Sequence, residues 1–208
     1  MGLVHHTASI SPTKQELAEA WLPTRTWGAG RAVVEKVAEY RLDDPAGEVG
    51  VETILWRLDD DSVCQVPFTY RGASLEGAEA HLIGTMEHSE LGRRWIYDGC
   101  GDPVWAAGLV HAIRTGGTQS QMFIEQDGQR IDIPPRMVVR GTGAEDFTPS
   151  PVVLGHAVDD ATSTSVLVDG RPLVLTRILT PGTADEDALI GQVGDDPTTY
   201  VLAALARL

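Results

Sequence analysis

Two aspartates four residues apart, Asp98 and Asp102, could form a carboxylate pair for acid–base chemistry. Asp102, however, precedes Pro103 and a run of apolar residues at helical spacing, and this makes it a typical helix N-cap. Asp98 is followed by Gly99, and the pair has the composition of a turn. We therefore expect both aspartates to be structural and predict no catalytic residue in the chain.

Histidines offer the next possible chemistry, as metal ligands. His81 and His88 are seven residues apart, about two helical turns, and in a helix they could share a face with Glu79 or Glu87. A metal site would need ligands at closer helical spacing and a third partner. We therefore predict surface or partly buried histidines and no metal site.

Three further patterns have a structural and a functional interpretation. Ser163 and Ser165 lie in a predicted strand without a nucleophile elbow, and Gly28-Ala29-Gly30 lacks the strand and helix of a dinucleotide site. Four tryptophans could stack on a sugar ring or anchor the core, and we favour the core: Trp27, Trp56, Trp95 and Trp105. No cofactor-binding residue is predicted.

Two helices are expected to frame these residues. The first begins with Ser11 as N-cap and Pro12 at the first helical position, and it ends at Pro23. The second begins at Asp102-Pro103 and closes at Gly116-Gly117, with an apolar stripe of Trp105, Leu109, Ala112 and Ile113.

Strands make up most of the remaining chain. Residues 33–42, 49–58 and 63–70 have β-branched and aromatic composition, and Pro67 indicates an edge or a bulge in the last of them. Asp127-Gly128 and Asp169-Gly170 each separate two short strands, and this dipeptide favours tight hairpins. Short turns predict antiparallel pairing rather than a doubly wound parallel sheet.

The predicted fold class is α+β: a curved, mainly antiparallel β-sheet with a few helices packed on it, plus a small C-terminal β-hairpin and helix. Residues 1–140 are expected to form the main domain, 141–151 a linker, and 152–208 the small C-terminal piece, whose helix would cover 198–208. The linker assignment rests on the Gly, Thr, Ser and Pro content of 141–151.

Charge and cysteine content limit the possible partners and compartments. The formal net charge of −14 argues against nucleic acid and anionic membrane surfaces as partners. Cys64 and Cys100 form no CxxC pair, and the N-terminal residues do not have the pattern of a signal peptide. We expect a cytoplasmic protein with two reduced, buried thiols and no apolar run long enough to span a bilayer.

Three segments, in this order and spacing, carry a family resemblance that covers most of residues 15 to 115. They are 21–31 (WLPTRTWGAGR), 65–71 (QVPFTYR) and 97–103 (YDGCGDP). Together they resemble the N-terminal cap region of bacterial maltokinases and related sugar kinases. The matching residues, which we expect to be structural, include Trp27, Gly30, Pro67, Tyr70, Arg71, Asp98, Asp102 and Pro103.

The segment from 159 to 187 resembles the beginning of the same family's kinase lobe. Thr164 and Ser165 fit its first strand, and Pro181-Gly182 fits the turn after its second. The family's lysine position corresponds to Thr176, and Arg177 is the nearest cation. Phosphoryl transfer needs cations at the phosphates, magnesium ligands and a positioned carboxylate, and the pattern of the remaining residues provides no such set. The segment is therefore interpreted as a pseudokinase fragment.

The resemblance implies a non-catalytic binding or regulatory module of maltose, trehalose or α-glucan (glycogen) metabolism, without a cofactor. Its partner would be another protein or a sugar or glucan ligand, and the oligomeric state is open. Two alternatives stay open: an enzyme of α-glucan metabolism, such as a sugar kinase or a glucan-branching protein, and a structural subunit that completes a separate kinase lobe.

Overall fold

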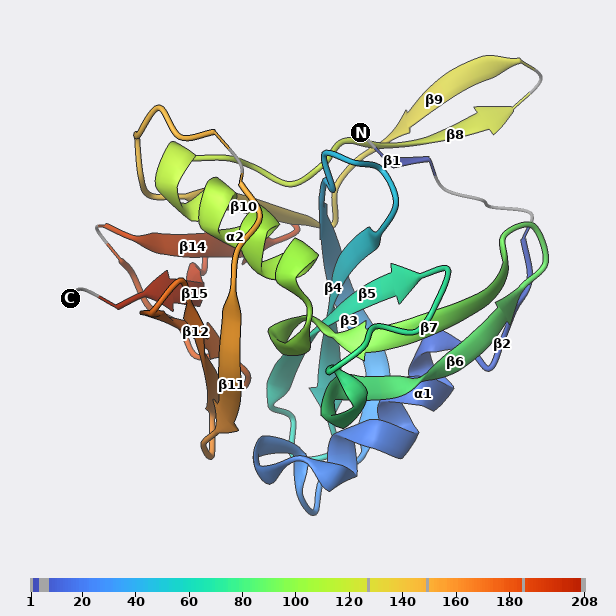
Figure 1. Ribbon diagram of the computed structural model, residues 1–208, viewed down its shortest axis with the longest axis horizontal. Helices are drawn as coiled ribbons and strands as arrows, with labels where there is room; N and C mark the ends of the chain where they lie inside the picture. The colour runs from blue at the N-terminus through green and yellow to red at the C-terminus, as the bar shows by residue number, and fades with distance from the viewer. Residues whose placement is uncertain (1, 4–7, 127, 149, 185, 207–208) are drawn as a thin grey trace.

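Three β-sheets dominate the computed structural model, which describes residues 2–3, 8–126, 128–148, 150–184 and 186–206 (Figure 1). The first sheet has six strands in the order β2-β6-β7-β5-β4-β3, and all of its pairings are antiparallel. Its strands are β2 (Ile10–Ser11), β3 (Val33–Leu42), β4 (Gly50–Leu58), β5 (Val63–Arg71), β6 (Leu82–His88) and β7 (Gly92–Asp98).

The second sheet is also antiparallel and has the order β10-β14-β15-β13-β12-β11. Its strands are β10 (Met137–Gly141), β11 (Leu154–Asp159), β12 (Ser163–Val168), β13 (Arg171–Thr176), β14 (Ala188–Val193) and β15 (Tyr200–Leu205). A third, smaller sheet joins β1 (Gly2–Leu3), β8 (Met122–Gln126) and β9 (Gln129–Ile133), and it projects from the top of the view in Figure 1.

Two α-helices pack on these sheets, so the fold is largely β and fits the predicted α+β class loosely. Helix α1 (Lys14–Trp21) packs against the first sheet, and α2 (Pro103–Thr115) contacts strands of both six-stranded sheets (Figure 1). Neither described α-helix has the length and apolar character required to span a bilayer.

The second helix has the ends that its sequence predicts. The Asp102 side chain accepts a hydrogen bond from the Val104 amide, Pro103 occupies the first turn, and Gly116 ends the helix in the left-handed conformation with φ 71°. A glycine adopts that conformation without steric cost. The predicted stripe of Trp105, Leu109, Ala112 and Ile113 is buried.

The start of the first helix differs from the prediction. Thr13, not Ser11, is the N-cap, because its hydroxyl accepts a hydrogen bond from the Glu16 amide while the Glu16 carboxylate accepts one from the Thr13 amide. Ser11 instead belongs to β2 and pairs with Glu87. A capping box satisfies two otherwise unpaired amides, and Ser11 lies too early to form one with Glu16.

The predicted C-terminal helix is wrong, because Tyr200–Leu205 form strand β15 between β14 and β13. A central strand buried on both faces has a continuous apolar run, and such a run cannot be told from a buried helix by periodicity. The last two residues of the predicted helix, 207 and 208, lie outside the described residues.

All residues of strand β10 except Gly141 lie within the predicted main domain, yet the strand pairs with β14 of the C-terminal region. The division at 141–151 stays a prediction, but the two regions share the second sheet.

The core has two parts, one on each face of the first sheet. On one face, α1 and the turns after it bury Trp21, Leu22 and Trp27 against Ile54 and Phe68. On the other face, α2 and the second sheet pack against residues of β3 and β4. Strand β4 is therefore buried on both sides, and most of its residues are inaccessible to solvent.

Candidate functional site

Three of the predicted motif residues, Trp27, Asp98 and Thr164, lie at a buried junction between the two large sheets. Arg177, which follows β13, is inaccessible to solvent, and its Nη2 donates to Asp98 Oδ2 at the end of β7 over 2.5 Å. Its Nε donates to the hydroxyl of Thr164 on β12 over 2.8 Å. The guanidinium also lies over the Trp27 ring, 4.6 Å from its centroid. We call Arg177, Asp98, Thr164 and Trp27 the buried junction.

The junction continues outward through a second ion pair. The Thr164 hydroxyl donates to Asp159 Oδ1 over 2.6 Å, and Arg25 donates to Asp159 Oδ2 from both Nε and Nη2. Burial by itself would raise the pKa of Asp159, but the bonds from Thr164 and Arg25 lower it below its usual value. Burial would likewise lower the pKa of Arg177, while the charge of Asp98 raises it. These side chains are therefore held in their charged forms.

Thr176, at the position that corresponds to the family's lysine, takes part in a second contact between the two large sheets. Gln65 of β5 is buried, and its Nε2 donates to the Thr176 carbonyl over 2.6 Å and to the Leu202 carbonyl over 2.7 Å. The backbone N–H of Gln65 also donates to the Arg177 carbonyl. The backbone around the kinase-like lysine position is thus bonded to the first sheet.

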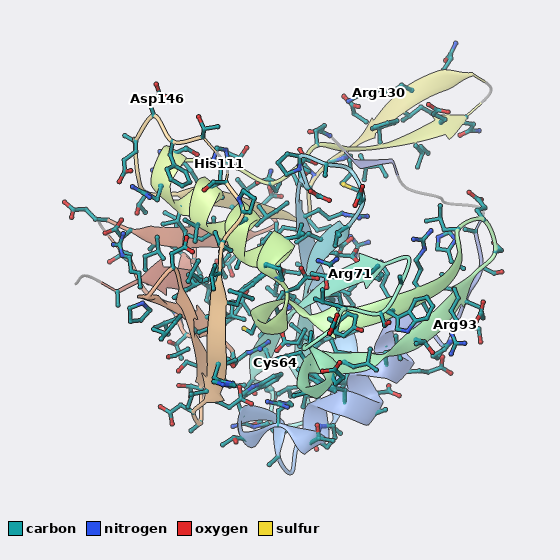
Figure 2. The ribbon with its side chains drawn as sticks, in the orientation of Figure 1. Cys64, Arg71, Arg93, His111, Arg130 and Asp146 are labelled. Atoms are coloured by element: carbon teal, nitrogen blue, oxygen red, sulfur yellow. The ribbon has the colours of Figure 1, made fainter. Side chains whose placement is uncertain are left out.

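Arg71, the last residue of β5, and Asp102, the N-cap of α2, form another ion pair. Arg71 Nε and Nη2 donate to the two carboxylate oxygens of Asp102, over 2.7 and 2.6 Å. Asp102 is inaccessible to solvent and also caps α2, so this pair fixes the helix start to the end of β5. Figure 2 labels Arg71 in the middle of the molecule, near that helix start.

The other motif residues have separate backbone positions. Gly30 has φ 75° in the turn before β3, and Pro67 pairs with Thr53 of β4. On the side of β5 away from β4, the backbone amide of Gln65 donates to the Arg177 carbonyl, and pairing with β7 begins only at Phe68. Pro67 lies between these two contacts, so no strand partner is left without a donor because Pro67 lacks an N–H. Ser165 pairs with Val174. Pro181 bridges Tyr200, and the Gly182 amide donates to the Thr199 carbonyl.

The remaining sequence candidates are dispersed. Trp27, Trp56 and Trp105 are core residues, and Trp95 is half-buried beneath the Arg93 guanidinium. His81 lies in a 3-10 turn (Glu79–His81), whereas His88 ends β6, so the helical face imagined for them does not exist. Both cysteines are buried and free, and burial raises the pKa of the Cys64 thiol to about 12. Across the described residues, no three potential metal ligands gather at one place.

One motif residue, Tyr70, lines a pocket of about 480 Å³, which we call the Glu52 pocket. Glu52 of β4 is buried, and its Oε2 accepts hydrogen bonds from Lys14 Nζ over 2.6 Å and from the Tyr70 hydroxyl over 2.5 Å. The Lys14 ammonium also lies 5.5 Å from the centre of the Tyr70 ring. Arg41, Gly50 and Arg94 also line this pocket.

The charges around Glu52 decide its protonation. Burial alone would raise its pKa, but the positive charges of Lys14 and Arg41 and the bonds from Lys14 and Tyr70 outweigh burial and lower the pKa to about 2. Burial beside this carboxylate raises the pKa of Tyr70 well above its usual value. The pocket therefore presents an ionised carboxylate, a neutral phenol and several cations. It can hold a hydroxylated ligand, because these groups supply both acceptors and donors.

The sequence predictions missed Lys14, Arg41, Glu52 and Arg94. One signal was available for Glu52, since it is a carboxylate in a predicted strand with Val51, Ile54 and Leu55, and a charge in a buried strand needs a partner. No local pattern connects it to Lys14, which lies 38 positions earlier.

Comparison with known proteins agrees with the resemblance for part of the chain. Residues 21–102 match the family model described as the maltokinase N-terminal cap domain. The matched range runs from the last residue of α1 to the N-cap of α2 and includes Arg41, Glu52, Tyr70 and Arg94. A comparison with curated proteins gave no match. The predicted resemblance to the maltokinase N-terminal cap domain is thereby confirmed for residues 21–102.

Proposed function

We propose that this chain is a non-catalytic, cytoplasmic binding or regulatory module of maltose, trehalose or α-glucan metabolism. The match of residues 21–102 to the maltokinase N-terminal cap domain carries the proposal, since it associates the chain with maltose and α-glucan metabolism. The Glu52 pocket supports it, because an ionised carboxylate next to a tyrosine and cations suits a polyhydroxylated ligand.

The contacts of Arg177 support a non-catalytic role. It is the cation nearest the family's lysine position, and both of its bonded nitrogens donate to protein side chains inside the buried junction. A guanidinium held in this way is not available to a nucleotide phosphate, and Thr176 itself carries no charge.

A sugar-binding experiment tests the binding role. The purified full chain is heated with maltose, maltotriose, trehalose or a sugar that is not a glucan unit, and its Tm is measured. Selective binding stabilises the native state by mass action, so we expect an increase in Tm with at least one glucan-related sugar and none with the unrelated sugar. Unchanged Tm values for all of them at saturating concentrations would contradict the proposal.

An activity measurement tests the alternative that the chain is an enzyme. We expect no phosphorylated sugar when the chain is incubated with ATP, magnesium and maltose. Turnover that survives purification and disappears in Thr176→Val would favour the kinase alternative instead. Thr176 contributes a backbone carbonyl to the Gln65 contact, so this substitution preserves that bond.

The second alternative, a subunit that completes a separate kinase lobe, has one observation in its favour. Strand β11 is an edge of the second sheet, and Val158 on it is 65% exposed, while Leu167 on the neighbouring strand β12 is 45% exposed. An apolar edge strand can pair with another chain. Co-purification with a separately expressed kinase lobe, lost in Val158→Lys, would support this alternative.

A further inference from the structure

The Glu52 pocket contains cations that have no carboxylate partner. Lys14 is paired with Glu52, but no ion pair is found for Arg41 or Arg94 within the residues that the structure describes. Arg94 Nη2 donates to the Leu91 carbonyl, whereas its buried Nε has no hydrogen-bond partner in the described part of the chain. The charge of Arg41 acts on Glu52 and Asp43 through space.

The protein has 30 acidic residues and only 16 lysines and arginines, so carboxylate partners are available in excess. With acids in excess, most arginine side chains in the structure have found a carboxylate. Two arginines without one, on the wall of a single pocket, therefore indicate a site where an anion would supply the missing partner.

Two glycines leave the space that these arginines occupy. A Cβ at Gly50 would lie 3.0 Å from Arg41 Nη2 and 3.3 Å from Tyr70 Cδ2. A Cβ at Gly72 would lie 3.1 Å from Arg94 Nη1. A larger residue at either position would require the guanidinium group to shift by a few tenths of an ångström. Glycine at both positions therefore leaves room for the guanidinium groups at their present places.

Glu52 restricts the kind of anion that the pocket accepts. Its ionised carboxylate would repel a bare anion, but it can accept hydrogen bonds from ligand hydroxyl groups. A ligand that carries an anionic group at one end and hydroxyls at the other satisfies both requirements. A volume of about 480 Å³ is within the range that small-molecule ligands occupy.

We infer that the Glu52 pocket binds a small phosphorylated sugar, with its phosphate at Arg41 and Arg94 and its hydroxyls at Glu52. The inference rests on the proposed function and deepens it by naming the ligand class. Phosphate oxygens accept charge-assisted hydrogen bonds from guanidinium groups, and the side chains of Arg41 and Arg94 both line the pocket.

Calorimetric titration of the full chain tests this assignment. The probes are glucose 6-phosphate, inorganic phosphate and glucose, at low and high salt. We expect glucose 6-phosphate to bind more tightly than either of the other two, and to bind more weakly at high salt because the contacts are ionic. Arg41→Gln and Arg94→Gln should each weaken binding roughly tenfold, as expected for the loss of charge-assisted hydrogen bonds.

Arg93→Gln is the matched control. Arg93 precedes Arg94 on β7 and therefore points to the opposite face of the sheet, where it lies over Trp95 and is 58% exposed. Its substitution should change the affinity by less than about twofold. If Arg93→Gln weakens binding as much as Arg94→Gln does, the assignment is wrong.

Three other results would overturn the assignment of a phosphorylated sugar to the Glu52 pocket. They are no binding of glucose 6-phosphate, an affinity for glucose 6-phosphate no greater than that for inorganic phosphate, or an affinity for glucose 6-phosphate that is independent of salt. The salt series uses the unsubstituted chain, so it decides the matter even if a variant fails to fold. Maltotriose is titrated in parallel. Binding of maltotriose without binding of glucose 6-phosphate would reject the pocket assignment and leave the proposed function standing.

Discussion

The buried junction and the Glu52 pocket are both built around an ionised carboxylate and a cation, but they differ in access to solvent. Arg177 and Asp98 are almost completely buried and form an ion pair, and Arg177 also donates to Thr164. In the Glu52 pair, Lys14 is 34% exposed and the carboxylate borders an open pocket. The same chemistry therefore joins two sheets in one place and leaves ligand-accessible groups in the other.

The comparison shows how far charge alone indicates function. A buried ion pair carries no information about a ligand when each charge lies against an opposite charge of the protein, as Arg177 and Asp98 do. A cation at a pocket wall without such a partner does carry that information, as Arg41 and Arg94 do. The substitutions below test this difference, in order of decreasing effect.

Removal of the junction cation should have the largest effect. Arg177→Ala leaves Asp98 buried without its charged partner, so we expect a loss of about 3–5 kcal/mol in the free energy of unfolding, measured by urea denaturation. Adding Asp98→Asn should recover part of this loss, because the unpaired charge is then removed. A loss below 1 kcal/mol for Arg177→Ala would mean that the junction does not hold the sheets together.

Acid should lower the free energy of unfolding by protonating Glu52. Its pKa is lowered from 4.5 to about 2 in the folded state, so the stabilisation is complete above the unfolded value and is lost as the pH falls from 4.5 towards 2. The loss should be on the order of 3 kcal/mol over that window. Urea denaturation of the wild type and of Glu52→Gln at several pH values measures it. Equal pH dependence in the two proteins would exclude Glu52 as the source.

Removal of one neutral donor from the pocket should have a smaller effect. Tyr70→Phe deletes the hydroxyl that donates to Glu52 but keeps the ring beside Lys14. We expect a loss of about 1–2 kcal/mol in unfolding free energy, since one hydrogen bond to a charged acceptor disappears. The pH dependence assigned to Glu52 should decrease at the same time. An unchanged acid transition would show that Tyr70 does not affect the pKa of Glu52.

A surface pair provides the smallest effect and a baseline for the others. Arg57 and Glu35 form an ion pair in which both side chains are largely exposed, at 41% and 59%. Arg57→Ala should change the unfolding free energy by less than about 0.5 kcal/mol, because water screens the pair. A loss comparable to that of Arg177→Ala would show that burial is not what distinguishes the junction.

Local sequence patterns predicted the second helix and the antiparallel pairing well. Asp102, Pro103 and Gly116 define the ends of α2 through interactions with their own neighbours, and Asp169-Gly170 joins β12 to β13 through a turn that two residues specify. The family resemblance was also visible in sequence, because its motifs lie in three short segments. These features depend on residues close together in the chain.

The wrong predictions have a common physical origin in tertiary contacts. The apolar residues of β15 are compatible with a helix as well as with a strand. They form a strand because β14 and β13 pair with them on both sides. Arg177 and Asp98 are 79 positions apart, and Lys14 and Glu52 are 38 positions apart. No local rule pairs such residues, so their partners follow from the packing of the sheets.

The sequence by itself determined the turns, the ends of α2, the acidic charge and the cap-like segments, because each follows from short-range geometry or composition. Tertiary structure alone decided that Arg177 is enclosed between two sheets, whereas Arg41 and Arg94 border a pocket. Burial and the distance to a partner charge set the protonation and availability of each group, and both are properties of the folded chain.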